Sequence, residues 1–555
     1  MPVWEGGKSE RQGVILWIPA WNMAGGENRA NVHLVIHRKR IWRIELMKKL
    51  QMTTTGKPEV GASSACTITW ETIDWNSIKV HVKRLQMRIA KAVRGGRHHK
   101  VKTLQWLLTH SYYAKLLATR RVTQNPGKNT PGVDGIVWKT AEEKMQAVSM
   151  IKRRGYQPQP LRRIYIPKKD GNSKRPLSIP TMIDRSSQAI HLMALEPVVE
   201  IMADRNSYGF RPNRSCADAI EQCFRALARK CSASWILEGD IKSCFDKISH
   251  TWLLEHTIMD KVMLKKWLNA GYMEKGTIYP MEEGTPQGGI ISPCLLVNAL
   301  AGLEASVKAL VRPSDKVNIC VYADDFVITG ATREVLEEKV KPAVQAFLAK
   351  RGLTLSETKT KITDIDKGFD FLGFNIRKYK GKLLIKPAKA NVNLHLNNLR
   401  ELIRGSVGWT TSELIRQLNP KIRGWSYYYR HVVAKETFSK VDDSVFKALK
   451  HWIKRRHPQK NAHWRMKKYF RKEGSRHWMF SVKTLTKEGT VQILDLFSAA
   501  KVSIKRHVKI RSDATPYDPA FREYLKKRHT KRLVKVKAGL PGQLDGAGLR
   551  IARAV

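Results

Sequence analysis

Residues 317–329 read Val317-Asn318-Ile319-Cys320-Val321-Tyr322-Ala323-Asp324-Asp325-Phe326-Val327-Ile328-Thr329, two apolar, β-prone runs that meet at a pair of adjacent carboxylates. The pattern predicts a β-hairpin with Asp324 and Asp325 at its tip. Two buried carboxylates are costly to desolvate unless a cation meets them. Phosphoryl-transfer enzymes use such carboxylates to hold two divalent metal ions about 4 Å apart. The structural alternative is an ordinary tight turn, in which Asp is common.

A third acid follows a second predicted strand. Residues 235–246 indicate a strand that ends at Asp240 and turns into a helix. Mg²⁺ prefers oxygen ligands, so Asp240 is the candidate third ligand, with the backbone carbonyl of Ile241 beside it. An N-cap aspartate is the structural alternative. The spacing does not show that Asp240 meets Asp324, because only the fold can bring them together.

Two further segments carry groups suited to a nucleotide. Residues 284–293 form a Gly-rich turn ahead of a helix, where the backbone can approach a base or sugar closely and Gln287 offers a donor and an acceptor. Residues 166–177 predict a β-hairpin with four cations around its turn, and a triphosphate needs cations on a rigid support. An ordinary loop and a solvated hairpin tip are the structural alternatives.

The composition points to a polyanionic partner. The chain of 555 residues has 101 Lys and Arg against 48 Asp and Glu, a net charge of +53, and its hydrophobic content of 42% is enough for packed cores. A membrane surface is the second reading, but no apolar run approaches the roughly 20 residues that span a bilayer. Seven cysteines without a C-x-x-C pair favour a reducing compartment and disfavour a structural zinc site.

The chain changes character along its length. Residues 1–65 show no sustained period and predict a loosely folded extension. Apolar residues at helical spacing begin at Trp70, and a second helical run covers 104–117. Residues 160–375 mix short strands with helices. Beyond 376 strand signals decrease, while Lys, Arg, Trp and Tyr become frequent.

Eight blocks occur in a fixed order. They are residues 130–135, 166–176, 206–215, 240–246, 284–289, 322–325, 352–360 and 371–374. This ordered set resembles the reverse transcriptases that group II introns encode, over roughly residues 70 to 530. The resemblance implies an α+β fold: a right-hand polymerase with fingers and palm, an α-helical thumb or maturase domain, and a basic C-terminal region.

The resemblance also suggests domain boundaries and site residues. The domains expected are an extension at 1–69, fingers and palm at 70–375, thumb and maturase (X) domain at 376–480, a DNA-binding-like region at 481–535 and a tail at 536–555. Asp240, Asp324 and Asp325, with the Ile241 carbonyl, would bind two Mg²⁺ that drive attack of a primer 3′-hydroxyl on a dNTP. Lys168 and Arg175 would clamp the triphosphate, and Phe245 would exclude a 2′-hydroxyl. Gln287 would contact the incoming nucleotide, and Arg211 would contact the template. Lys359 would give charge or a proton to pyrophosphate, and residues 371–374, with Gly373, would support the primer end.

The C-terminal third alternates cations with aromatics, which suits RNA because phosphates need charge and unpaired bases stack on rings. The structural alternative is a helical bundle with aromatics in its core, and we favour it for most individual rings. The cations as a set are expected to grip intron RNA; the candidates are Arg423, Lys454, Arg455 and Arg456.

These observations predict an RNA-directed DNA polymerase that also assists splicing and mobility of its intron. A splicing-only maturase without polymerase activity is the alternative, and a retron-type enzyme is a third. The expected partners are intron RNA, a DNA primer or target and dNTPs, with no membrane, and a homodimer is left open. The expected compartment is intracellular: the bacterial cytoplasm, a plastid or a mitochondrion. Many relatives continue into an endonuclease with cysteine pairs, whereas this chain has no cysteine after Cys320, so we predict no second-strand cleavage.

Overall fold

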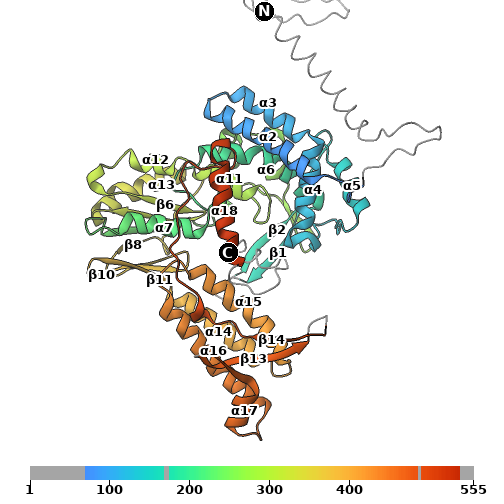
Figure 1. The fold of residues 1–555 in the computed structure, drawn as a ribbon. Helices are drawn as coiled ribbons and strands as arrows, with labels where there is room; N and C mark the ends of the chain where they lie inside the picture. Colours follow the sequence, from blue (N-terminus) through green and yellow to red (C-terminus); the bar gives the residue numbers. More distant parts are fainter. Residues whose placement is uncertain (1–68, 168–173, 475, 486–488, 538–555) are drawn as a thin grey trace, which may run out of the picture. The chain divides into compact units, whose positions relative to one another are not determined.

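The computed structural model describes residues 69–167, 174–474, 476–485 and 489–537. The chain divides into two units, residues 1–68 and 69–555, and every described residue belongs to the second. The expected extension therefore lies outside the described residues, apart from Thr69, as do most of the tail and Lys168. Helices and four small sheets make up the second unit, so the class is α+β (Figure 1).

Helices dominate the first part of this unit. They are α2 (Trp75–Arg94), α3 (His98–Thr109), α4 (Tyr112–Gln124), α5 (Ala141–Met150) and α6 (Met182–Met202). Asp74 caps α2 by accepting from the Asn76 and Ser77 N–H groups. The expected single run over 104–117 is wrong: two helices share it, because the chain leaves the helix at His110 and restarts after Ser111. Apolar faces of α2, α3 and α4 pack on the almost wholly buried α6.

The central sheet has the strand order β6-β7-β3-β8. Its strands are β3 (Trp235–Asp240), β6 (Ile319–Tyr322), β7 (Asp325–Gly330) and β8 (Lys361–Asp364). Both faces are covered: Phe326 and Ile328 pack into the core shared with α6, and Val327 packs into the core shared with α7 (Cys216–Leu227). This double burial explains why the run after Asp325 is continuously apolar rather than alternating.

A second sheet, with order β2-β1-β4-β5, carries the expected cationic hairpin. Its strands are β1 (Leu161–Pro167), β2 (Lys174–Ile179), β4 (Tyr272–Glu274) and β5 (Thr277–Tyr279). β1 and β2 are antiparallel, with Ile166 opposite Arg175. Short helices connect the two sheets: α8 (Cys244–Lys247), α9 (His250–His256), α10 (Lys261–Leu268), α11 (Ser292–Leu300) and α12 (Leu303–Lys308). A further helix, α13 (Lys341–Ala349), lies between β7 and β8 of the central sheet.

The C-terminal part is less purely helical than expected. A sheet of β9 (Phe369–Phe371), β10 (Phe374–Tyr379) and β11 (Lys382–Pro387) leads into α14 (Lys389–Gly405), α15 (Thr411–Tyr429), α16 (Lys435–Arg456) and α17 (Ala462–Tyr469). A further antiparallel sheet of β12 (Phe470–Glu473), β13 (Arg476–Leu485) and β14 (Val491–Asp495) follows. Cations on these strands obscure their apolar pattern in the sequence. The chain then returns to the first part and ends, as described, in α18 (Arg522–Lys537).

Candidate active site

The two adjacent carboxylates lie at the tip of the predicted hairpin. Tyr322 and Asp325 are partners across β6 and β7, so Ala323 and Asp324 form the turn. Ala323 adopts a left-handed conformation with φ of 59°, which is unusual for a residue with a side chain. A Cβ added to Gly209 would lie 2.3 Å from the Ala323 nitrogen, so only glycine allows the loop at 206–215 to support the turn this closely.

The structure brings the third acid to this tip. β3 and β7 are antiparallel, and Asp240 is the direct cross-strand partner of Asp325, which corresponds to a Cα separation of about 4.5–5.5 Å. Gly239 makes this register possible, because a Cβ there would lie 2.1 Å from the Phe326 ring. Ile241 follows directly and is buried. The sequence could not establish this juxtaposition, and the sheet provides it.

The carboxylates repel one another. Burial first, and then the charges of Asp324 and Asp240, raise the pKa of Asp325 to about 7. Its residue surface remains exposed to solvent. Burial and the Asp240 charge also raise the pKa of Asp324. A site that holds three acids against their own repulsion is one that a cation would stabilise.

Lys359 supplies one positive charge at this site. Its Nζ lies 3.1 Å from Asp240 Oδ2, on a side chain that is 67% exposed. The segment that carries it is anchored to the strand end, because the Ser356 N–H donates to the Asp240 carbonyl at 2.8 Å and Leu355 bridges Ile241. Within the described residues, no three His, Cys, Asp or Glu side chains already enclose a position for a metal ion.

The Gly-rich loop packs against the turn that follows Asp240. The Thr285 N–H donates to the Phe245 carbonyl at 2.5 Å, and the left-handed Gly284 lies so near the Asp246 backbone that a Cβ would approach it to 2.5 Å. Gln287 Nε2 donates to Asp246 Oδ2 at 3.2 Å. The loop therefore holds Gln287 against Asp246, on the turn that follows Asp240.

Two charged residues that sequence reasoning did not select also belong to this region. Burial raises the pKa of Asp246, whereas Arg163, Gln287 and Arg175 favour its charged form. The Arg163 guanidinium lies 3.8 Å from the centre of the Tyr272 ring. The position of Asp246, six residues after Asp240 on the same strand-to-helix turn, was the signal available. Arg163 offered none.

The cationic hairpin faces the same site, although only part of it is described. Arg175 is exposed on β2, and its charge lowers the pKa of both Asp324 and Asp246. Lys168, its expected companion, lies outside the described residues. Phe245 contacts Phe210 edge to face, with ring centres 6.1 Å apart, so an aromatic pair lines the site beside the carboxylates.

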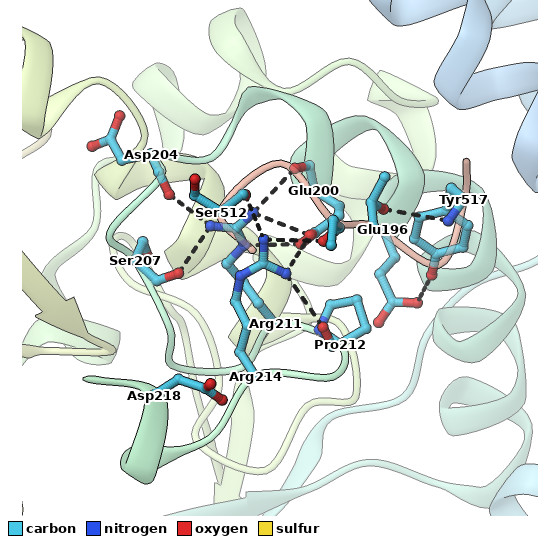
Figure 2. Close-up of polar contacts among 12 residues, drawn as sticks. Glu196, Glu200, Asp204, Ser207, Arg211, Pro212, Arg214, Asp218, Ser512 and Tyr517 are labelled. Carbon is cyan, nitrogen blue, oxygen red and sulfur yellow. Dashed lines mark hydrogen bonds and ion pairs between the residues drawn. The ribbon is translucent and has the colours of Figure 1, made fainter. Parts of the chain in front are cut away.

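The expected template contact at Arg211 is wrong for its guanidinium. Figure 2 shows Arg211 turned into the protein, where Nε and Nη2 donate to the Glu200 carboxylate at 2.8 and 3.1 Å and Nη1 donates to the carbonyls of Asp204 and Ser207 at 2.6 and 2.9 Å. Its side chain is 4% exposed. The motif suggested a surface cation, but a buried carboxylate on α6 captures it. A cavity of about 230 Å³ is lined by this pair and not by Asp240, Asp324 or Asp325.

Gly373 lies at the turn between β9 and β10, ahead of the C-terminal helices. It has a φ of 81°, and a Cβ would lie 2.5 Å from Asn391 Nδ2. Its carbonyl accepts from the Tyr429 hydroxyl at 3.1 Å, and the Leu372 carbonyl accepts from Tyr428 at 3.0 Å. The turn thus joins β9–β10 to α14 and α15.

The four candidate RNA contacts differ in their surroundings. Lys454 is exposed on α16. Arg455 donates to the Arg404 carbonyl at 2.8 Å, and Arg456 donates to the carbonyls of Val407 and Trp409. Arg423 lies over the Phe497 ring at 5.1 Å and has an unpartnered, buried Nε. Lys454 is therefore the freest of these cations to meet RNA.

Several aromatics of this part are core residues, as the structural alternative expects. Trp452, Phe438 and Tyr429 are at most 2% exposed. The Trp452 indole N–H donates to the Ser406 carbonyl at 2.9 Å, which ties α16 to the end of α14.

None of the helices in the described ranges is long and apolar enough to cross a membrane.

Three family models match successive parts of the chain. They are the N-terminal domain of reverse transcriptase at residues 70–151, reverse transcriptase (RNA-dependent DNA polymerase) at 166–376, and the group II intron maturase-specific domain at 392–470. The matches follow the order of the helical, catalytic and C-terminal parts described above.

Curated relatives agree with these models. Protein YkfC of Escherichia coli is 32% identical over 311 residues, which cover 48% of this chain and 80% of YkfC. The group II intron-encoded protein LtrA of Lactococcus lactis is 30% identical over 390 residues, 58% of this chain and 62% of LtrA. The match thus spans about three fifths of LtrA. A telomerase structure from Candida albicans aligns with a TM-score of 0.33 and 12% identity over 56% of this chain and 64% of that one. The chain belongs to the family of group II intron-encoded reverse transcriptases and maturases, with an RNA-directed DNA polymerase domain followed by a maturase domain.

Proposed function

We propose that this protein extends a DNA primer on an RNA template, with Asp240, Asp324 and Asp325 as ligands for two Mg²⁺ ions. One observation carries the proposal: Asp240 stands opposite Asp325 across β3 and β7, next to Asp324 at the turn. Phosphoryl transfer is mostly positioning and electrostatic stabilisation, so a fixed group of acids beside a cationic hairpin suits it.

The donors fit magnesium. All are oxygens, the ligand type that Mg²⁺ prefers, and their mutual repulsion favours a bound cation. The Ile241 carbonyl is a further oxygen ligand in this proposal. When bound, two such ions stabilise the attacking and leaving oxygens of an in-line displacement.

Other residues of the chain bind and orient the nucleotide. Arg175 attracts the triphosphate, with Lys168 as its proposed companion. Phe245 excludes a 2′-hydroxyl by its bulk, and Asp246 holds Gln287 in place beside the nucleotide through their hydrogen bond. Lys359, with its largely exposed ammonium group beside Asp240, neutralises the pyrophosphate that leaves.

The maturase domain is the second part of the proposal. We infer that helices α14–α16 and their cations bind intron RNA and assist splicing, and that the polymerase then copies the intron during its mobility. The match to the maturase-specific model at 392–470 and the net charge of +53 support this role. The intact acid trio and the retained Phe245 and Gln287 argue against a splicing-only protein.

The test is primer extension on an RNA template with Mg²⁺ and dNTPs, alongside splicing of the intron that surrounds the gene. We expect both activities in the full chain. Splicing without primer extension would leave the splicing-only alternative standing. Extension on DNA and RNA templates without any binding of intron RNA would instead remove the maturase role.

A further inference from the structure

The segment after β14 leaves the maturase domain and lies on the polymerase domain. Residues 499–528, the C-terminal strap, begin at the loop that follows β14, and the Lys505 N–H donates to the Arg430 carbonyl at 2.8 Å. Ile510, Ala514 and Tyr517 are at most 4% exposed. The resemblance suggests DNA binding for this basic segment, yet these buried residues fix it to the protein, and Figure 1 shows the chain running from β14 back to α18.

Asp218 joins the strap to the start of α7. Its Oδ2 accepts from the N–H and hydroxyl of Ser215 at 3.0 and 2.8 Å. Its Oδ1 accepts from His507 Nε2 at 2.9 Å, the Ile510 N–H at 2.7 Å and Arg528 Nη2 at 2.8 Å. The carboxylate is 1% exposed. One buried anion therefore ties three residues of the strap to the end of the loop at 206–215.

Arg214 makes a second connection at the same loop. Figure 2 shows its guanidinium between α6 and the strap: Nη1 donates to Glu200 Oε1 at 2.6 Å, and Nη2 donates to the Ser512 carbonyl at 3.1 Å. The Tyr517 hydroxyl donates to Glu196 on the same helix. The strap is thus hydrogen-bonded both to the loop, through Arg214, and to α6.

Lys509 links the strap most directly to the catalytic hairpin. Its Nζ donates to Gln222 Oε1 at 2.7 Å and to the Tyr208 hydroxyl at 3.2 Å. The Tyr208 N–H in turn donates to the Val321 carbonyl on β6 at 2.9 Å. The next residue, Gly209, touches the left-handed Ala323. Two hydrogen bonds therefore separate the Lys509 ammonium group from the strand that leads into the acid pair.

The loop at 206–215 needs such support. Phe210 and Asn213 have φ of 57° and 63°, conformations that cost free energy for residues with side chains and persist only where surrounding contacts impose them. Lys509 is half-buried, and both of its acceptors belong to the protein. Its ammonium group is thus poorly placed to contact a phosphate.

We propose that the C-terminal strap positions the loop at 206–215 behind the catalytic hairpin, and that Lys509 is a positioning residue for DNA synthesis rather than a nucleic-acid contact. This inference rests on the proposed polymerase function. It separates strap residues that brace the polymerase from exposed cations of the same segment that remain free for nucleic acid.

The experiment compares two lysines of the full-length protein. Lys509→Met removes the brace, and Lys505→Met removes the same charge from an exposed side chain four residues away. We expect Lys509→Met to lower kcat of primer extension about three- to tenfold, with the Kd for primer–template unchanged. Lys505→Met should leave kcat unchanged. Lys509→Arg keeps a charged donor and should restore most of the rate.

Tyr208→Phe is the second variant, since it removes one of the two acceptors of Lys509, together with the 3.3 Å bond from the Tyr208 hydroxyl to Asn206 Oδ1, and keeps every charge. Its loss of kcat should match that of Lys509→Met, and the double variant should lose little more. Equal weakening of primer–template binding by Lys509→Met and Lys505→Met, with kcat intact, would overturn the proposal in favour of a charge contact.

A readout without activity separates this inference from the proposed function. Hydrogen exchange of the peptide spanning residues 204–214 should be faster in Lys509→Met than in the wild type or Lys505→Met. Faster exchange in a protein that fails to extend primers would refute the polymerase proposal and keep the brace. Unchanged exchange would refute the brace, whatever the activity.

Discussion

The central sheet and the maturase helices differ in which charges they gather and in what those charges contact. In the sheet, three of the scarce acids of a basic chain gather at one strand end, and Lys359 forms an ion pair with one of them. In α16, cations are common, and Arg455 and Arg456 use their donors on main-chain carbonyls. The contrast teaches that a rare charge marks a site in the sequence, whereas an abundant charge does not.

The largest expected effect tests the acid side of this comparison. Asp324→Asn should lower primer extension by about a thousandfold or more, because it removes a proposed metal ligand, and such a ligand contributes several kcal/mol of transition-state stabilisation. Primer-extension rates and the circular dichroism spectrum measure activity and fold. Asp443→Asn on α16, which loses an exposed carboxylate of the maturase helices, is the control and should keep full activity. Retained incorporation by Asp324→Asn would refute the assignment.

Lys359 tests whether one cation beside the acids contributes more to DNA synthesis than a neighbouring lysine does. Lys359→Met should lower kcat roughly tenfold, since the exposed ammonium group beside Asp240 is proposed to meet the leaving pyrophosphate. Lys361→Met, an exposed lysine on β8, removes the same charge two residues away and should have little effect. Equal losses in the two variants would mean that general charge, rather than this position, matters.

The pH dependence of stability gives a smaller effect in the metal-free protein. Folding raises the pKa of Asp325 to about 7, so the folded state holds a proton that the unfolded state has lost between about pH 4 and pH 7. This group therefore costs stability as pH rises through that window. Asp325→Asn removes this charge and should therefore raise Tm at pH 8. The rise should be only about 1–3 °C, because the group is exposed to solvent, and no rise is expected at pH 4. Thermal unfolding of the variant and the wild type at pH 8 and pH 4 measures this difference in Tm.

The smallest effect belongs to the maturase helices. Lys454→Ala should weaken RNA binding about two- to fivefold and reduce the salt dependence of log K by about one phosphate contact. Arg455→Ala should in addition lower Tm, because its guanidinium also bonds the Arg404 carbonyl at the end of α14. Salt titrations of RNA binding and thermal scans of both variants measure this difference. An equal loss of Tm in Lys454→Ala would contradict the view that Arg455 supports the fold while Lys454 does not.

The sequence predicted the hairpin at 317–329 and the cationic hairpin because their signals are local, whereas the α+β class followed from the family resemblance. Asp324 and Asp325 stand out inside an apolar run, and turn residues separate β1 from β2. The juxtaposition of Asp240 with Asp325 depends on sheet register, which no local pattern encodes. The burial of Arg211 depends on tertiary packing as well, because its guanidinium forms an ion pair with Glu200, eleven residues earlier on α6. The β12–β13–β14 sheet was missed because cations interrupt its apolar residues.

The buried Asp218 has a consequence for biosynthesis. Its five hydrogen bonds include three from residues 507–528, so the anion is satisfied only after nearly 300 further residues have been made. Until then only the two Ser215 donors and solvent meet this carboxylate, because the strap that buries it has not been made. The loop at 206–215 would therefore gain this support only late in synthesis, and a chain stalled before residue 507 would lack it.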